Sequence, residues 1–302
     1  MPPKTAARSI RLPPGRILAV LATLGALAAG GGPARAFDLA LYEDVLAHYT
    51  RPVPDLAGVR VDYRSLAAAP KWRALMASLR EAEPSRLATR DERLAFWINA
   101  YNALAIDLVV RHYPVESIRD LGSLFRPVWR RSAGVIDGRP VSLHEIEHRI
   151  LRPMGEPRIH GALVCASLSC PPLRREPYRA AGLPEQLDGN VRRWLGDPRK
   201  GARLDRTTRT LHLSRVFDWF EEDFAPAGGV VAFVAQYLPP AEAAFLRANR
   251  DEIEVRFLPY DWRLNDLATA PGAEEEDASG PRSRGSGEGS RRASSRSRST
   301  AG

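Results

Sequence analysis

Apolar residues recur at helical spacing in the stretch DERLAFWINAYNALAIDLVVRHY, residues 91–113. Thr89 and Glu92 form a capping-box pattern at its start, and Pro114 marks its end. The pattern therefore predicts a long helix in the core. Its buried face is expected to consist of Leu94, Trp97, Ile98, Tyr101, Leu104, Ala105 and Leu108.

Shorter stretches predict further helices at residues 39–48, 65–79, 143–151, 184–195, 216–224, 229–237 and 241–248. Strand signals are fewer. GVIDGRPVS carries Asp137-Gly138 between two short arms, a tight-hairpin pattern, and ARLDRTTRTLHLS predicts a second hairpin. RIHGALVC and EIEVRFLPYDW are predicted as buried strands. Helices outnumber strands without βαβ alternation, so the expected class is α+β, a single mostly helical domain with a small β-sheet and hairpins.

The N-terminal residues differ in composition from the middle of the chain. Residues 1–16 carry four basic residues and no acidic one, an apolar run follows from Ile17, and Ala34-Arg35-Ala36 offers small residues to a signal peptidase. These features predict a cleavable secretory signal over residues 1–36, with an uncleaved anchor as the alternative. The mature chain then begins near Phe37 in an exported, oxidising compartment, the periplasm or the cell exterior. Membrane contact is expected only through the signal before cleavage.

Residues 269–302 lack aromatic and large aliphatic side chains and are predicted to form a disordered low-complexity tail. The folded domain is therefore expected over residues 37–268. The two ends carry 11 basic and 5 acidic residues, so the middle keeps 33 basic against 31 acidic. The net charge of +8 thus belongs mostly to the ends, and no nucleic-acid partner is expected for the folded part. We expect a small-molecule or peptide substrate and no cofactor.

The segment His144-Glu145-Ile146-Glu147-His148 matches H-E-x-x-H, which on a helix places two imidazoles on one face and can hold zinc. Two observations weigh against a zinc site. The following HRILRPMGE lacks the glycine and third histidine of the extended pattern, and Ser142-x-x-Glu145 is a capping box. A metal-dependent hydrolase using His144 and His148 is the weaker hypothesis, and no metal ligand is predicted.

Both cysteines of the chain lie in RIHGALVCASLSCPP, residues 158–172, shortly after His160. Four roles are open for Cys165: nucleophile, disulfide partner of Cys170, metal ligand or small buried group. An oxidising compartment favours the disulfide, whereas a nucleophile needs a base and a lowered thiol pKa. His160 and Cys165 point to opposite faces of a regular strand, so they meet only if the strand ends or bulges before Cys165.

The candidate bases for a thiol site are His148 and His160, and Glu147 or Asp261 could orient an imidazole. Asn99 and Asn102 lie three residues apart on one face of the predicted core helix. A buried asparagine must be hydrogen-bonded. Each amide therefore either braces a neighbouring loop, or orients a histidine or donates to an oxyanion.

Five segments, AFWINAYNAL, IEHRILR, RIHGALVCASLSCPPL, LSRVFDWFEEDF and YDWRLN, occur in this order. The set resembles the family called domain of unknown function 547 (DUF547), found in bacteria and plants, over about residues 38–266. In that family the position of His144 is usually not histidine, which implies that the zinc motif is fortuitous. Plant members tend to have serine at Cys170, which implies that any shared chemistry belongs to Cys165. The resemblance implies recurring polar positions at Asn99, Asn102, Glu147, His148, His160, Cys165, Asp261, Trp262 and Asn265.

Two main functions remain open at this point. The first is an exported hydrolase or acyltransferase acting on an amide or ester, in which Cys165 attacks, His148 takes its proton and Glu147 or an asparagine sets the tautomer. The second is a non-catalytic binding or scaffold domain of the cell envelope, whose polar residues form a buried hydrogen-bond network.

Overall fold

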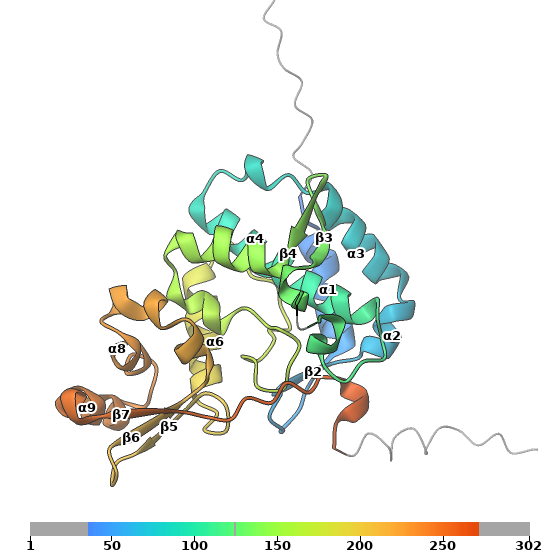
Figure 1. Cartoon of the computed structure of the whole chain (residues 1–302). Helices are drawn as coiled ribbons and strands as arrows, with labels where there is room; N and C mark the ends of the chain where they lie inside the picture. The colour runs from blue at the N-terminus through green and yellow to red at the C-terminus, as the bar shows by residue number, and fades with distance from the viewer. Residues whose placement is uncertain (1–35, 124, 272–302) are drawn as a thin grey trace, which may run out of the picture. The chain divides into compact units, whose positions relative to one another are not determined.

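A computed structural model describes residues 36–123 and 125–271, all of which belong to one compact unit. The predicted signal peptide, apart from its last residue, lies outside the described residues, as does the predicted tail beyond residue 271. The described part contains helices together with small sheets of two and three strands, which confirms the α+β class (Figure 1).

The predicted core helix is α4, Arg90–Val110, and its sides are buried nearly all round along most of its length. The capping box is formed, because the Thr89 hydroxyl accepts from the Glu92 N–H and the Glu92 carboxylate accepts from the Thr89 N–H. Its length and composition would allow it to cross a bilayer, but most of it is buried inside the protein as a core helix. It is the axis against which the first half of the domain packs.

Three helices precede α4: α1 Leu39–Tyr49, α2 Tyr63–Ala68 and α3 Pro70–Glu81 (Figure 1). α2 packs against α4, and α1 packs against α2 and α3. The prediction of one helix over 65–79 was wrong, because the residue before a proline is driven out of the helical region. Ala69 is accordingly extended, with ψ 121°, and Pro70 starts α3 at a position where its missing N–H costs nothing.

Both predicted hairpins are confirmed. β3 Ser132–Ile136 pairs with β4 Arg139–Ser142 through Asp137 and Gly138, both at positive φ, and β5 Ala202–Asp205 pairs with β6 Thr210–Leu213. β1 Thr50–Pro52 and β2 Val59–Val61 form a further antiparallel pair. β7 Glu254–Phe257 joins β6 in parallel, but it is an edge strand with mostly exposed residues and not the buried strand expected.

A second cluster of buried residues lies on the three-stranded sheet side of the domain. It involves α6 Leu183–Leu195, α8 Val230–Val234 and α9 Pro240–Ala248, shown in yellow and orange in Figure 1. Trp194 stacks on Phe217 with ring centroids 5.0 Å apart, and Phe224 packs against Phe217 and Phe233.

Three segments near the candidate site depart from the predicted elements. The helix expected over 143–151 is α5 Leu143–Glu145 followed by a π-helical turn, Ile146–Leu151. The helix expected over 216–224 is α7 Val216–Trp219 followed by 3₁₀ turns, Glu221–Ala227. The strand expected for RIHGALVC was wrong: Pro157–Gly161 is 3₁₀-helical, and Gly161 lies so close to Val191 of α6 that a Cβ would clash.

Candidate functional site

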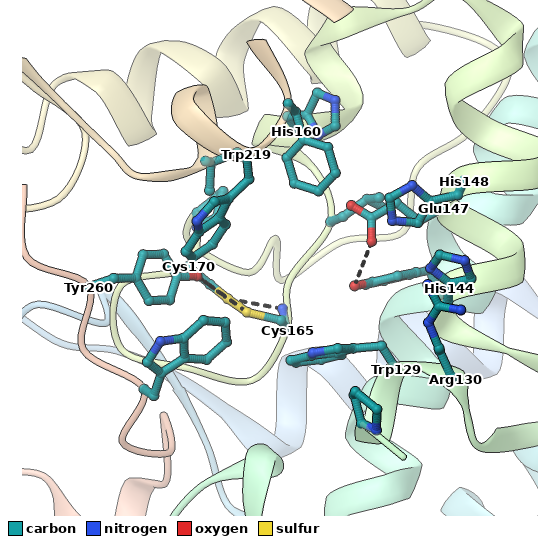
Figure 2. A pocket seen from close by; sticks show the side chains of 17 residues that line it. Trp129, Arg130, His144, Glu147, His148, His160, Cys165, Cys170, Trp219 and Tyr260 are labelled. Atoms are coloured by element: carbon teal, nitrogen blue, oxygen red, sulfur yellow. Dashed lines mark hydrogen bonds between the residues drawn. A yellow bond between two sulfur atoms is a disulfide. The ribbon is translucent and has the colours of Figure 1, made fainter. Parts of the chain in front are cut away.

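One cavity of about 370 Å³ brings together the four side chains that the sequence proposed for catalysis, namely Glu147, His148, His160 and Cys165 (Figure 2). The π-helical turn supplies Glu147 and His148, the 3₁₀ turn Pro157–Gly161 supplies His160, and the loop after it supplies Cys165. His160 and Cys165 share the cavity because the strand that would have separated them does not form.

The two cysteines are joined to each other. Cys165 and Cys170 form a disulfide at the cavity wall, shown in yellow in Figure 2. The Tyr260 hydroxyl lies 3.3 Å from each sulfur, and the Ser167 hydroxyl lies 3.4 Å and 3.2 Å from them. In the described residues no imidazole makes a hydrogen bond to either sulfur, so the disulfide state contains no thiol and no cysteine–histidine pair.

The loop that carries the disulfide is fastened to the segment 261–265. Ala166 C=O accepts from the Asn265 N–H at 3.0 Å, and further backbone hydrogen bonds join residues 168 and 169 to Arg263 and Asp261. Ala166 has φ 62°, a left-handed conformation that costs a residue with a Cβ about 1–2 kcal/mol. Outside the two hairpin turns, it is the one non-glycine residue at positive φ in residues 36–123 and 125–271. The fold therefore holds the residue next to Cys165 in a strained conformation.

Glu147 lies in the cavity (Figure 2), and its carboxyl group accepts a hydrogen bond from the Tyr101 hydroxyl at 3.4 Å. Burial raises the pKa of Glu147 to about 7, against the opposing effects of Arg152 and Tyr101. A carboxyl group with this pKa exchanges its proton near neutral pH, as a general acid or base must.

The raised pKa makes the stability contribution of Glu147 depend on pH. A carboxyl whose folded pKa lies above its unfolded value stabilises the fold fully below the unfolded value, and that contribution is lost as the pH rises through the folded pKa. We expect the free energy of unfolding, relative to Glu147→Gln, to fall by about 3 kcal/mol between pH 4 and pH 8. Urea unfolding of both proteins at each pH measures it, and a constant difference would contradict the assignment.

His148 is hydrogen-bonded to Arg152, one helical turn later, through its Nδ1 atom at 2.8 Å. A guanidinium group can only donate, so Nδ1 accepts and the ring proton lies on Nε2. Burial, His144 and Arg152 together lower the pKa of His148 to about 4, so the ring is neutral at pH 7. His148 is thereby set up as a hydrogen-bond donor through Nε2. The sequence had assigned it the role of base.

His160 is oriented by Asp223, which the sequence analysis did not identify. The ring Nε2 lies 2.7 Å from Asp223 Oδ2, and Arg152 holds the same carboxylate through Nε at 2.6 Å and Nη2 at 2.8 Å. Burial raises the pKa of Asp223, but the hydrogen bonds from His160 and Arg152 outweigh it and hold that pKa well below its usual range. Arg152 and its partners thus link both histidines to one carboxylate.

The two asparagines brace backbone segments. The Asn99 amide donates to Tyr178 C=O at 2.7 Å and accepts from Tyr178 N–H at 2.9 Å. The Asn102 amide donates to Ala162 C=O at 3.0 Å and accepts from Val164 N–H at 2.9 Å, which fixes the irregular chain before Cys165. Neither side chain lines the cavity that contains the disulfide.

Asp261 and His144 do not have the roles in imidazole orientation and metal binding that the sequence had suggested for them. Asp261 lines a neighbouring groove, where its carboxylate pairs with Arg263. The His144 and His148 rings lie 4.3 Å apart, and Ser142 accepts from the Glu145 N–H at the start of α5. Within the described ranges, no group of three or more His, Cys, Asp or Glu side chains is placed to hold a metal ion.

Comparison with known proteins bears on residues 84–195, which match the family model described as "Protein of unknown function, DUF547". This is a DUF547 domain-containing protein. No curated protein and no solved structure matches the chain. The DUF547 match includes α4, the π-helical turn and both cysteines, so Glu147, His148, His160 and Cys165 all lie within it.

Sequence reasoning about the DUF547 domain missed four cavity or network residues: Tyr101, Arg152, Asp223 and Tyr260. The sequence carried a signal for two of them, because Tyr101 is the tyrosine of WINAYN and Arg152 is one turn after His148. Asp223 and Tyr260 lie beyond the DUF547 match and far along the chain from their partners. Asp223 belongs to a run of acidic residues with Asp218, Glu221 and Glu222, and no local pattern distinguishes this one carboxylate.

Proposed function

We propose that the cavity is the active site of an exported hydrolase or acyltransferase, in which Cys165 attacks an amide or ester carbonyl once the disulfide has been reduced. The observation that carries the proposal is the convergence of Glu147, His148, His160 and Cys165 on one cavity of about 370 Å³. That volume suits a small substrate group. Support also comes from the strained Ala166 beside Cys165, because such strain is concentrated at functional sites. The export part of the proposal rests on the signal-peptide pattern of residues 1–36. N-terminal sequencing of the mature protein tests it, and we expect the first residue to be Phe37.

The chemistry requires a reductant before catalysis. A dithiol supplies two electrons and two protons, which convert the Cys165–Cys170 disulfide to two thiols while the dithiol becomes a disulfide. The Cys165 thiol then gives its proton to the Glu147 carboxylate, which is about half ionised near neutral pH. The thiolate sulfur forms a bond to the carbonyl carbon, and the oxyanion that results can accept a hydrogen bond from His148 Nε2.

The tetrahedral intermediate breaks its bond to the amine or alcohol, which leaves with the proton held by Glu147. The acyl group remains on Cys165 as a thioester. Water, or an acceptor amine or alcohol, then attacks the thioester carbon, gives up a proton through Glu147 and restores the thiol. His160 and Asp223 position Arg152, and through it the His148 ring.

Thiol labelling tests this proposal directly. We expect native protein to take up no iodoacetamide without reductant, and one equivalent at Cys165 at neutral pH after reduction, because thiolates react and disulfides do not. Cys170→Ser should label at Cys165 without reductant, and Cys165→Ser serves as the matched control. The proposal fails if folded Cys170→Ser labels only after denaturation, which would show a buried and inert sulfur.

A non-catalytic binding domain is the second candidate, and one observation favours it. The sulfurs are bonded to each other, and neither histidine makes a hydrogen bond to them in the described structure. Under this alternative the disulfide shapes the cavity wall, and Cys165→Ser lowers stability without affecting any turnover. A labelling experiment in which the reduced folded protein stays unreactive would support it.

A further inference from the structure

A second, larger hollow lies beside the cavity. A groove of about 1270 Å³ adjoins it, and the two share Pro127, Trp129, Tyr260 and Trp262 among their lining residues. Together they exceed the volume that a drug-sized ligand occupies. The shape suits a chain of several units, one of which enters the cavity while its neighbours occupy the groove.

Aromatic rings form the wall that the two hollows share. Trp219 stacks with Trp262 at 5.6 Å and contacts Tyr260 at 4.8 Å, and Trp129 lies 6.0 Å from Trp262. Trp219 is 42% exposed, unusual for so large an apolar side chain. The Arg119 guanidinium lies over the Trp262 ring, 5.1 Å from its centroid. Mutually packed indoles, of which Trp219 is exposed and Trp129 and Trp262 are half-buried, offer rigid flat surfaces with polar edges.

The charges that border the groove are mixed. Glu116, Asp120 and Asp261 line it together with Arg119 and Arg263, and Asp261 pairs with Arg263 within the groove wall. A chain with charge of either sign would meet like charges there. Hydroxyl groups, which both donate and accept, are complementary to carboxylates and guanidinium groups alike.

The backbone groups of two residues in this wall, Asp261 and Arg263, are already paired and cannot bind an extended peptide. The Asp261 N–H donates to Ser169 Oγ at 2.9 Å and the Asp261 C=O accepts from the Ser169 N–H. The Arg263 N–H donates to the Asp261 carboxylate, and the Arg263 C=O accepts from the Leu168 N–H. Strand addition requires unpaired groups of this kind, so it is not available at these residues.

We propose that the groove binds a neutral oligosaccharide bearing N-acyl or O-acyl groups and presents one acyl group to the cavity. The attack on the acyl group rests on the proposed function, whereas the binding of the oligosaccharide rests on the groove alone. Sugar rings offer apolar faces to the aromatic wall and hydroxyl edges to the charged border. The amide or ester of the acyl group is the bond that Cys165 would attack.

Binding of β-1,4-linked N-acetylglucosamine oligomers, followed by tryptophan fluorescence, tests the groove without any turnover. For the oxidised full-length protein we expect the tetramer to bind at least tenfold more tightly than the monosaccharide. Trp262→Leu should weaken tetramer binding about tenfold, and Arg119→Met should weaken it less. Phe257→Ala, another exposed aromatic position outside both hollows, is the matched control and should leave binding unchanged.

The outcomes separate the two proposals. Length-dependent binding that Trp262→Leu reduces supports the groove even if Cys165 proves inert, in which case only the catalytic proposal fails. If the reduced protein turns over esters and oligosaccharide binding does not depend on oligomer length, the proposal for the groove fails and the proposal for Cys165 is retained. Tighter binding of a neutral hexapeptide than of the tetramer also overturns the oligosaccharide assignment.

Discussion

Replacing Cys165 by alanine is expected to lower the turnover of 4-nitrophenyl acetate by the reduced protein about a thousandfold or more. Loss of a nucleophile removes the covalent pathway itself, so it costs far more than loss of a supporting hydrogen bond. The reduced wild type should release one equivalent of nitrophenolate in an initial burst, because the acyl-enzyme forms faster than it is hydrolysed. Stopped-flow absorbance measures both the burst and the later steady state.

Cys170→Ser is the matched control for this prediction. It keeps the Cys165 thiol but cannot form the disulfide, so it should show the burst without any reductant. Wild type should need a dithiol, and the two proteins should then be alike. An undiminished burst in Cys165→Ala, or activity of the oxidised wild type equal to that of the reduced protein, would assign any esterase activity to another group.

Asp223→Ala is expected to lower the free energy of unfolding by about 3 kcal/mol at pH 7. The carboxylate accepts hydrogen bonds from His160 and from two nitrogens of Arg152, and its removal leaves a buried imidazole and a partly buried guanidinium without their partner. Arg152 is about a quarter exposed, so water compensates part of the loss. Urea unfolding measures the change.

The pH dependence distinguishes this explanation from a general packing defect. Because the pKa of Asp223 is held well below its usual range, its contribution is present above the unfolded value and is lost as the pH falls through the folded one. The penalty of Asp223→Ala should therefore shrink in acid. Glu222→Ala, an exposed neighbour, should change stability by less than about 0.5 kcal/mol. An equal loss of unfolding free energy in Asp223→Ala and Glu222→Ala would contradict the stabilising role of the Asp223, His160 and Arg152 hydrogen bonds.

The elements that the sequence predicted well are those whose causes are local. α4 combines a regular apolar face with a capping box and a terminating proline, and all three signals lie within 26 residues, 89–114. The Asp137-Gly138 hairpin is equally local, because its turn needs positive φ at two adjacent residues. Each pattern excludes competing structures without help from the rest of the chain.

The sequence predictions failed where tertiary contacts determine the local structure. The residues before Cys165 have an apolar strand-like composition, yet Gly161 packs against α6 and the Asn102 amide pairs with Ala162 and Val164 instead of a neighbouring strand. The cavity was predictable as a set of residues, since Glu147, His148, His160 and Cys165 do converge. The hydrogen-bond roles of the His148 and His160 imidazoles were not predictable, because they depend on Arg152 and on the distant Asp223.

The fastening of the disulfide loop to residues 261–265 has a consequence for biosynthesis. During translation, Cys165 and Cys170 emerge together, whereas Tyr260 and the residues that pair with the loop follow roughly 90 residues later. An oxidase can therefore join the two sulfurs while that wall of the cavity does not yet exist. The finished domain would then carry the disulfide from the start, and the thiol chemistry proposed for Cys165 would need a reductase that acts on the folded protein.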